Sequence, residues 1–105
     1  MTAHARVYLE AEEHEILAAR DAVIAKLEAM VRSLDVRNLK TKDDLIEALR
    51  VLYVDTEHEC RPARILLVKC CEGNMGALAM DFAFINHMRT TALGADIALE
   101  ACIRG

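Results

Sequence analysis

The fold is decided by residues 74–103, which run NMGALAMDFAFINHMRTTALGADIALEACI without a proline. Large apolar side chains recur at helical spacing on two sides of this stretch, and a helix that is apolar on two sides must be covered on both. One side carries Met75, Leu78, Phe82, Ile85, Leu93 and Ile97, and the other carries Met80, Phe84, Met88, Ala95 and Cys102. The pattern predicts one long helix over about residues 74–103. Gly94 falls inside it and costs about 1 kcal/mol relative to alanine, which a close crossing of two backbones would explain.

A second long helix is predicted at about residues 3–35, a segment with neither proline nor glycine. Its apolar stripe consists of Leu9, Ile16, Leu17, Val23, Ile24, Leu27, Met30, Val31 and Leu34. A helix of about 30 residues extends roughly 45 Å, whereas a compact chain of about 100 residues has a radius of gyration near 13 Å. Two such helices are too long for one compact protomer. We therefore predict an elongated all-α bundle that is completed by dimerisation.

Two short helices are predicted between the long ones, at about residues 42–57 and 62–72. Thr41 is a suitable N-cap for the first of them. Pro62 and Gly73 stand where the second would begin and end, since proline is favoured just inside a helix start and glycine just past its end. The sequence thus predicts four helices in all.

One alternative keeps the long helices but places a small β-hairpin at 51–54 and 65–68, which would make the fold α+β. Both segments are short apolar runs, and periodicity alone does not distinguish a short strand from a buried helix. In either case a chain of 105 residues is expected to form a single domain, 1–105.

Composition and charge exclude several classes of protein. The net charge of −4 and the pI of about 5.5 argue against a nucleic acid partner, because duplex-binding proteins present a basic face. His4, Arg6 and Glu10 interrupt any signal peptide at the start of the chain. No run reaches the roughly 20 apolar residues of a membrane span. We therefore expect a cytoplasmic protein with no membrane partner.

The chain offers little for catalysis or metal binding. Ser33 is its only serine, no phosphate-binding glycine loop is present, and the cysteines lack the C-x-x-C spacing of a zinc site. We expect Cys60, Cys70, Cys71 and Cys102 to stay reduced and to fill the core. The tripeptide Glu-His-Glu occurs at 13–15 and 57–59, but bundle metal sites use Glu-x-x-His, whose two ligands share a helix face. The sequence predicts no catalytic residue, no cofactor and no metal ion, and hence no enzyme.

Charged residues within the apolar stripes predict how the dimer is arranged. Arg89 and Asp96 lie on one seam of the last helix, where a charge costs desolvation energy unless it meets a partner. Across a two-fold axis, Arg89 of one protomer would meet Asp96 of its partner. The predicted interface consists of Leu78, Phe82, Phe84, Ile85, Met88, Arg89 and Asp96. Glu13 and Arg20 form a similar pair in the first helix, and ordinary surface ion pairs are the alternative for both.

These observations predict a non-enzymatic regulatory or interaction protein that acts as a homodimer. It would bind and modulate another protein, for example a transcription regulator, through apolar helix faces, as in helix-groove recognition. The alternative is a small helical bundle that binds a metal ion or an apolar ligand, with His58, Cys60 and His87 as the first candidates for its ligands.

Overall fold

The computed structural model describes residues 1–56 and 60–104, and within them it contains seven helices and no strand. The helices are α1 (Thr2–Glu13), α2 (Leu17–Arg32), α3 (Leu39–Tyr53), α4 (Arg61–Glu72), α5 (Met75–Leu78), α6 (Phe82–Thr90) and α7 (Leu93–Arg104). The all-α prediction is therefore confirmed. Residues 51–53 and 65–68, which the alternative placed in strands, lie in α3 and α4.

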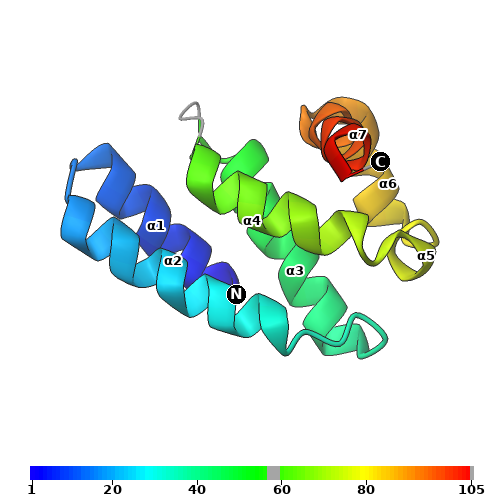
Figure 1. Ribbon diagram of the computed structural model, residues 1–105, viewed down its shortest axis with the longest axis horizontal. Helices are drawn as coiled ribbons and strands as arrows, with labels where there is room; N and C mark the ends of the chain where they lie inside the picture. The colour runs from blue at the N-terminus through cyan, green and yellow to red at the C-terminus, as the bar shows by residue number, and fades with distance from the viewer. Residues whose placement is uncertain (57–59, 105) are drawn as a thin grey trace.

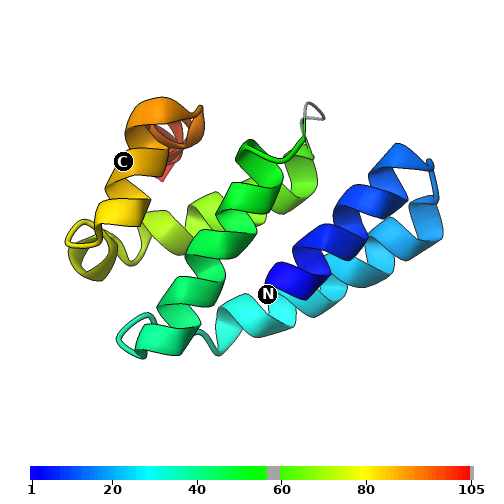
Figure 2. The same cartoon turned by 180° about the vertical axis from the view of Figure 1, so that it is seen from behind.

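The predicted long helices are wrong, because each is broken and folds back on itself. The segment 3–35 forms an antiparallel hairpin of α1 and α2, and the segment 74–103 divides into α5, α6 and α7. Figure 1 shows the α1–α2 hairpin at one end of the molecule, α3 and α4 crossing in the middle, and α5 to α7 at the other end. Figure 2 shows the same order from behind, with α3 in front of α4. The result is compact, with a radius of gyration of 12.9 Å and extents of 36 × 26 × 24 Å.

The first break is a helix C-cap that contains no glycine. Glu15 adopts a left-handed conformation with φ of 56°. The backbone nitrogen of Ile16 donates a hydrogen bond to the carbonyl oxygen of Ala11 (2.9 Å), and that of Glu15 donates to Glu12 (3.3 Å). This pair of hydrogen bonds defines the Schellman motif, in which glycine usually takes the left-handed position. Glutamate stands there instead, so no stop signal for the helix is visible in the sequence.

Replacing Glu15 with glycine is expected to raise the free energy of unfolding by about 0.5–1 kcal/mol. The left-handed conformation costs an L-residue roughly 1–2 kcal/mol, and the greater freedom of glycine in the unfolded chain offsets part of that gain. Urea denaturation measures the change. The matched control is Glu10→Gly inside α1, which should lose about 1 kcal/mol. A loss of stability in both variants would contradict the observed turn.

The second long segment is interrupted by two polar caps. The Asp81 carboxylate accepts hydrogen bonds from the backbone nitrogens of Ala83 (2.9 Å) and Phe84 (3.2 Å), which starts α6. Thr91 is extended, and its hydroxyl oxygen accepts a hydrogen bond from the backbone nitrogen of Leu93 (3.2 Å), which starts α7. Each cap satisfies amide groups that a helix start leaves without partners. The chain therefore turns at both sites rather than continuing as one helix.

Gly94 lies where α6 and α7 cross. A Cβ atom added to Gly94 would lie 2.5 Å from the carbonyl oxygen of Met88, a distance at which one of the two backbones must move. The close crossing expected for Gly94 is thus confirmed, and it occurs between two helices of the same chain.

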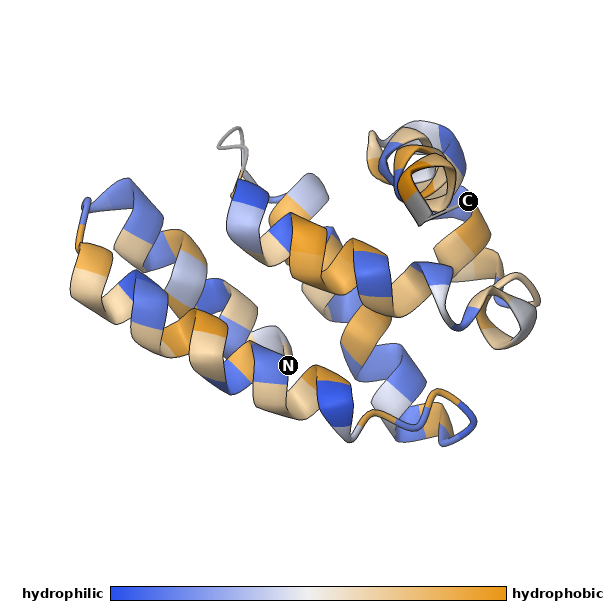
Figure 3. Cartoon of the chain, in the orientation of Figure 1, coloured by the Kyte–Doolittle hydropathy of each residue, from blue (hydrophilic) through white to orange (hydrophobic). Residues whose placement is uncertain are grey.

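Folding back the two long segments lets one chain bury many of its large apolar side chains. The fully buried ones include Tyr8, Leu27, Leu45, Leu49, Leu52, Leu67, Leu78, Phe84 and Leu93, which come from α1 through α7. Figure 3 shows hydrophobic turns on several helices, among them α2, α4 and α7. Helix length alone therefore does not require a second subunit. None of the helices in the described part of the chain combines the length and hydrophobicity needed to cross a bilayer.

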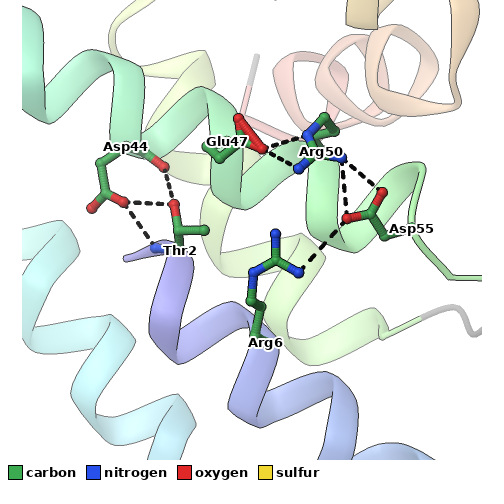
Figure 4. A network of polar contacts seen from close by, with 6 residues as sticks. All are labelled: Thr2, Arg6, Asp44, Glu47, Arg50 and Asp55. Atoms are coloured by element: carbon green, nitrogen blue, oxygen red, sulfur yellow. Dashed lines mark hydrogen bonds and ion pairs between the residues drawn. The ribbon is translucent and has the colours of Figure 1, made fainter.

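Polar contacts attach α1 to α3 (Figure 4). The hydroxyl of Thr2 donates a hydrogen bond to the Asp44 carboxylate (2.6 Å), and the backbone nitrogen of Thr2 donates to the same oxygen (3.0 Å). At the other end of α3, Asp55 pairs with Arg50 (2.9 Å) and lies 4.0 Å from Arg6 of α1. These contacts fix the register of α1 along α3.

Asp44 makes the stability of the fold depend on pH. Burial acts to raise its pKa, but hydrogen bonds from the nitrogen of Met1 and from Thr2 outweigh burial and hold the pKa below its ordinary value. Because the folded pKa lies below the unfolded value of about 3.9, Asp44 stabilises the fold above that value, and the contribution is lost as the pH falls through the folded pKa. The stability difference between the wild type and Asp44→Asn should therefore be constant between about pH 5 and pH 7 and shrink toward about pH 3. Urea denaturation across this range measures the difference, and a value independent of pH would contradict the role given to Asp44.

Candidate functional site

A half-open cavity of about 540 Å³ lies between α4 and α7, and we call it the α4–α7 groove. Its lining comprises Arg61, Arg64, Ile65, Val68 and Lys69 on the α4 side and Ala92, Asp96, Leu99, Glu100 and Ile103 on the α7 side. The two helices pack directly against each other, and α7 lies beside α4 at the end of the molecule opposite the α1–α2 hairpin (Figure 1). The volume falls within the roughly 300–1,000 Å³ typical of ligand pockets.

Three large apolar side chains on the walls of the groove are open to solvent. Ile65 is 44% exposed, Leu99 62% and Ile103 72%. The spacing of residues in α7 explains why, since Leu99 and Ile103 are four residues apart and share one face. Leu93 and Ile97 are buried on another face, toward the core. Because α7 packs on the core through Leu93 and Ile97, Leu99 and Ile103 remain exposed along the groove.

Hydrogen bonds hold the inner end of the groove in place. The hydroxyl of Tyr53 on α3 donates a hydrogen bond to the carboxylate of Asp96 on α7. Burial and this hydrogen bond raise the pKa of Tyr53, so the phenol stays protonated and remains a donor. The Arg64 guanidinium lies 4.3 Å above the ring of Tyr53 and donates two hydrogen bonds to the carbonyl oxygen of Leu52 (2.7 and 2.9 Å). Asp96 is thus engaged within the protomer and anchors α7 to α3.

The outer edge of the groove is basic. Arg61 and Lys69 are exposed, and they flank Ile65 at intervals of four residues, which places all three along one side of α4. The acidic residues of the lining face inward, because Asp96 binds Tyr53 and Glu100 is only 9% exposed. A ligand that approaches from solvent therefore meets cationic side chains beside the exposed apolar side chains of the walls.

The residues predicted to form the dimer interface do not share one surface. Leu78 and Phe84 are fully buried in the core of the protomer, so they cannot contact a second copy in this fold. Ile85 and Met88 are half-buried, whereas Phe82 and Arg89 are exposed. The predicted faces assumed one continuous helix, and the turns at residues 79–81 and 91–92 change which sides point inward.

One member of each charged pair predicted to set the dimer register has a partner within the chain. Asp96 binds Tyr53, as described above, which removes the physical need for Arg89 of a second protomer. Arg20 on α2 pairs with Glu12 of α1 (3.3 Å) rather than with Glu13. Each of these two contacts joins different helices of the protomer, α3 with α7 in the first case and α1 with α2 in the second.

The cysteines behave largely as expected. Cys60, Cys70 and Cys71 are buried, which confirms core filling for these three, whereas Cys102 is exposed on α7. Burial raises the pKa of Cys60 to about 11, so its thiol is protonated and a weak nucleophile near neutral pH. Among the described residues no group of three or more His, Cys, Asp or Glu side chains is placed to hold a metal ion. His58, a candidate ligand, lies outside the described residues.

The groove itself was missed by the sequence prediction, although a signal for it exists. Leu99 and Ile103 belong to neither of the two apolar sides assigned to the stretch 74–103. With Asp96 and Glu100 they follow the spacing i, i+3, i+4 and i+7, which marks a third, mixed face of that helix. This face is the one that lines the groove.

No known family matches the chain, and neither a curated protein nor a solved structure is similar to it. The groove between α4 and α7 is therefore the basis for a functional assignment.

Proposed function

We propose that this protein is a non-enzymatic interaction protein that binds and modulates another protein by holding an amphipathic segment of it in the α4–α7 groove. The observation that supports the proposal is the exposure of Ile65, Leu99 and Ile103 on the walls of a cavity of about 540 Å³. Large apolar side chains that surround a concave surface are typical of helix-in-groove recognition.

The apolar contact alone is too small for a micromolar affinity. Fully burying a large aliphatic side chain contributes about 1.5–3 kcal/mol. The three wall residues are only about half exposed before binding, so each can gain only part of that amount. Their burial would contribute on the order of 3–5 kcal/mol, whereas a micromolar complex requires about 8 kcal/mol after the cost of association. The partner must therefore supply further contacts.

The basic outer edge determines which partner fits best. Exposed Lys69 favours acidic residues next to the apolar side chains of the partner, because complementary charge speeds encounter and excludes basic competitors. The partner is thus an apolar segment with an acidic flank.

A second candidate function is the binding of a small apolar ligand in the same groove, and the cavity volume favours it. Native mass spectrometry of protein purified without denaturant distinguishes the two candidates. A stoichiometric mass increment that disappears on unfolding would favour the small ligand.

The proposed function is tested with Leu99→Asp, which places a charge on the groove wall. Affinity capture with the wild type should retain a partner that Leu99→Asp loses, and titration with that purified partner should show binding weakened more than tenfold. The matched control is Phe82→Asp, because Phe82 is 89% exposed on α6 and does not line the groove. Thermal unfolding verifies that both variants are folded. Equal retention by Leu99→Asp and the wild type would overturn the proposal.

A further inference from the structure

We infer that the α4–α7 groove of one protomer binds the α1–α2 tip of a second copy of this chain. The α1–α2 tip is the turn that joins the two helices, residues 13–17, and it contains Glu13, His14, Glu15, Ile16 and Leu17. The inference rests on the proposed role of the groove as a docking site and names an occupant for it.

The tip presents acidic side chains followed directly by apolar ones. Ile16 is 52% exposed and Leu17 59%. Glu13 and Glu15, which precede them in the chain, are exposed as well. These two carboxylates provide the acidic flank, and Ile16 and Leu17 provide the apolar contact, that the chemistry of the groove requires.

The tip is also held in a fixed shape before any contact forms. Its Schellman hydrogen bonds close the turn, with the nitrogen of Ile16 donating to Ala11 (2.9 Å). Next to the turn, Arg20 of α2 pairs with Glu12 of α1 (3.3 Å) and ties the two helices together. A surface that is already ordered loses little conformational entropy on binding, which improves the affinity of a small contact.

Charge distinguishes the tip from another exposed apolar surface, which Met80 and Phe82 form on the molecule. Met80 is 85% exposed and Phe82 89%, but they flank Asp81, whose carboxylate pairs with Lys42 (3.3 Å). This second surface therefore offers a compensated ion pair and not an acidic flank. The α1–α2 tip complements the basic edge of the groove, and the surface at Met80 and Phe82 does not.

The contact must form between two copies. Within one protomer the α1–α2 tip lies at one end of the molecule, and α7 lies at the other (Figure 1). When the tip of one copy lies in the groove of a second, the tip of the second can lie in the groove of the first across a two-fold axis. This reciprocal contact is the pattern of a symmetric dimer. A partner protein of the same chemistry would then compete with the second copy for the groove.

Sedimentation velocity at about 10 to 500 µM tests the contact, since an interface of this size is expected to be weak. The wild type should self-associate, whereas Leu17→Asp in the tip and Leu99→Asp in the groove should each raise the dissociation constant more than tenfold. An equimolar mixture of these two variants should associate again, because the intact tip of one meets the intact groove of the other. The control Phe82→Asp should associate like the wild type.

Charge reversal provides an independent readout. Glu15→Lys and Lys69→Glu should each weaken association, and the chain that carries both should associate more tightly than either. A wild type that is monomeric at every concentration, or a mixture of the Leu17 and Leu99 variants that stays monomeric while each is folded, would overturn the inference. If that monomer still captured a partner through Leu99, the proposed function would stand without a second copy in the groove.

Discussion

Replacing Phe84 with alanine should lower the free energy of unfolding by about 3–5 kcal/mol. The side chain is fully buried, and deleting a buried aromatic ring loses its transfer free energy and leaves a cavity that the surroundings fill only in part. A domain of this size is stable by roughly 5–15 kcal/mol, so the variant would lose a large fraction of its stability. Urea or guanidinium denaturation at constant pH measures the loss.

Phe82→Ala is the matched control, because it deletes the same ring two residues away on the same helix. Phe82 is 89% exposed, and exposed substitutions usually change stability by no more than about 0.5 kcal/mol. Similar losses for both variants would contradict the orientation of α6. The comparison also bears on the sequence prediction, which placed both phenylalanines in a dimer interface.

Helix type was predictable from this sequence, and the positions of the turns were only partly so. Apolar spacing of three and four residues identified helical segments correctly from α1 to α7. The turn at Glu15 gave no signal, since glutamate rarely occupies a left-handed C-cap. Asp81 and Thr91 did carry a signal, because both are residue types that favour helix N-caps. A continuous apolar pattern therefore does not exclude a break where a capping residue stands inside it.

The candidate site was harder to predict than the fold because burial depends on where each turn falls. Leu93 and Leu99 are both leucines of α7, yet the first is fully buried and the second is 62% exposed. The crossing of α6 and α7 decides which of them faces the core. Without that crossing, the sequence could indicate excess apolar surface but not its location. A second copy is inferred from the exposed α1–α2 tip and the α4–α7 groove, and not from helix length.

Gly94→Ala should lower the free energy of unfolding by about 1 kcal/mol. The new methyl group would lie 2.5 Å from the carbonyl oxygen of Met88, and this contact is with backbone, which cannot rotate away. Forcing a methyl group into a packed site typically costs about 1–3 kcal/mol, and here α7 must shift away from α6. The better helix propensity of alanine, about 1 kcal/mol, offsets part of the strain. Chemical denaturation measures the net loss, and the displaced α7 should also weaken binding in the α4–α7 groove.

Whether Gly94→Ala stabilises or destabilises the protein distinguishes one continuous helix over residues 74–103 from the broken structure. In one continuous helix Gly94 would be an interior residue, and alanine would stabilise it by about 1 kcal/mol. In the broken structure the same substitution destabilises, because α6 and α7 cross at Gly94. Gly76→Ala supplies the control, since a Cβ at Gly76 has no neighbouring atom within 4 Å. This substitution should leave the stability unchanged or stabilise α5 slightly. A stabilising Gly94→Ala beside a neutral Gly76→Ala would mean that the crossing does not form, and the groove that depends on the position of α7 would be lost with it.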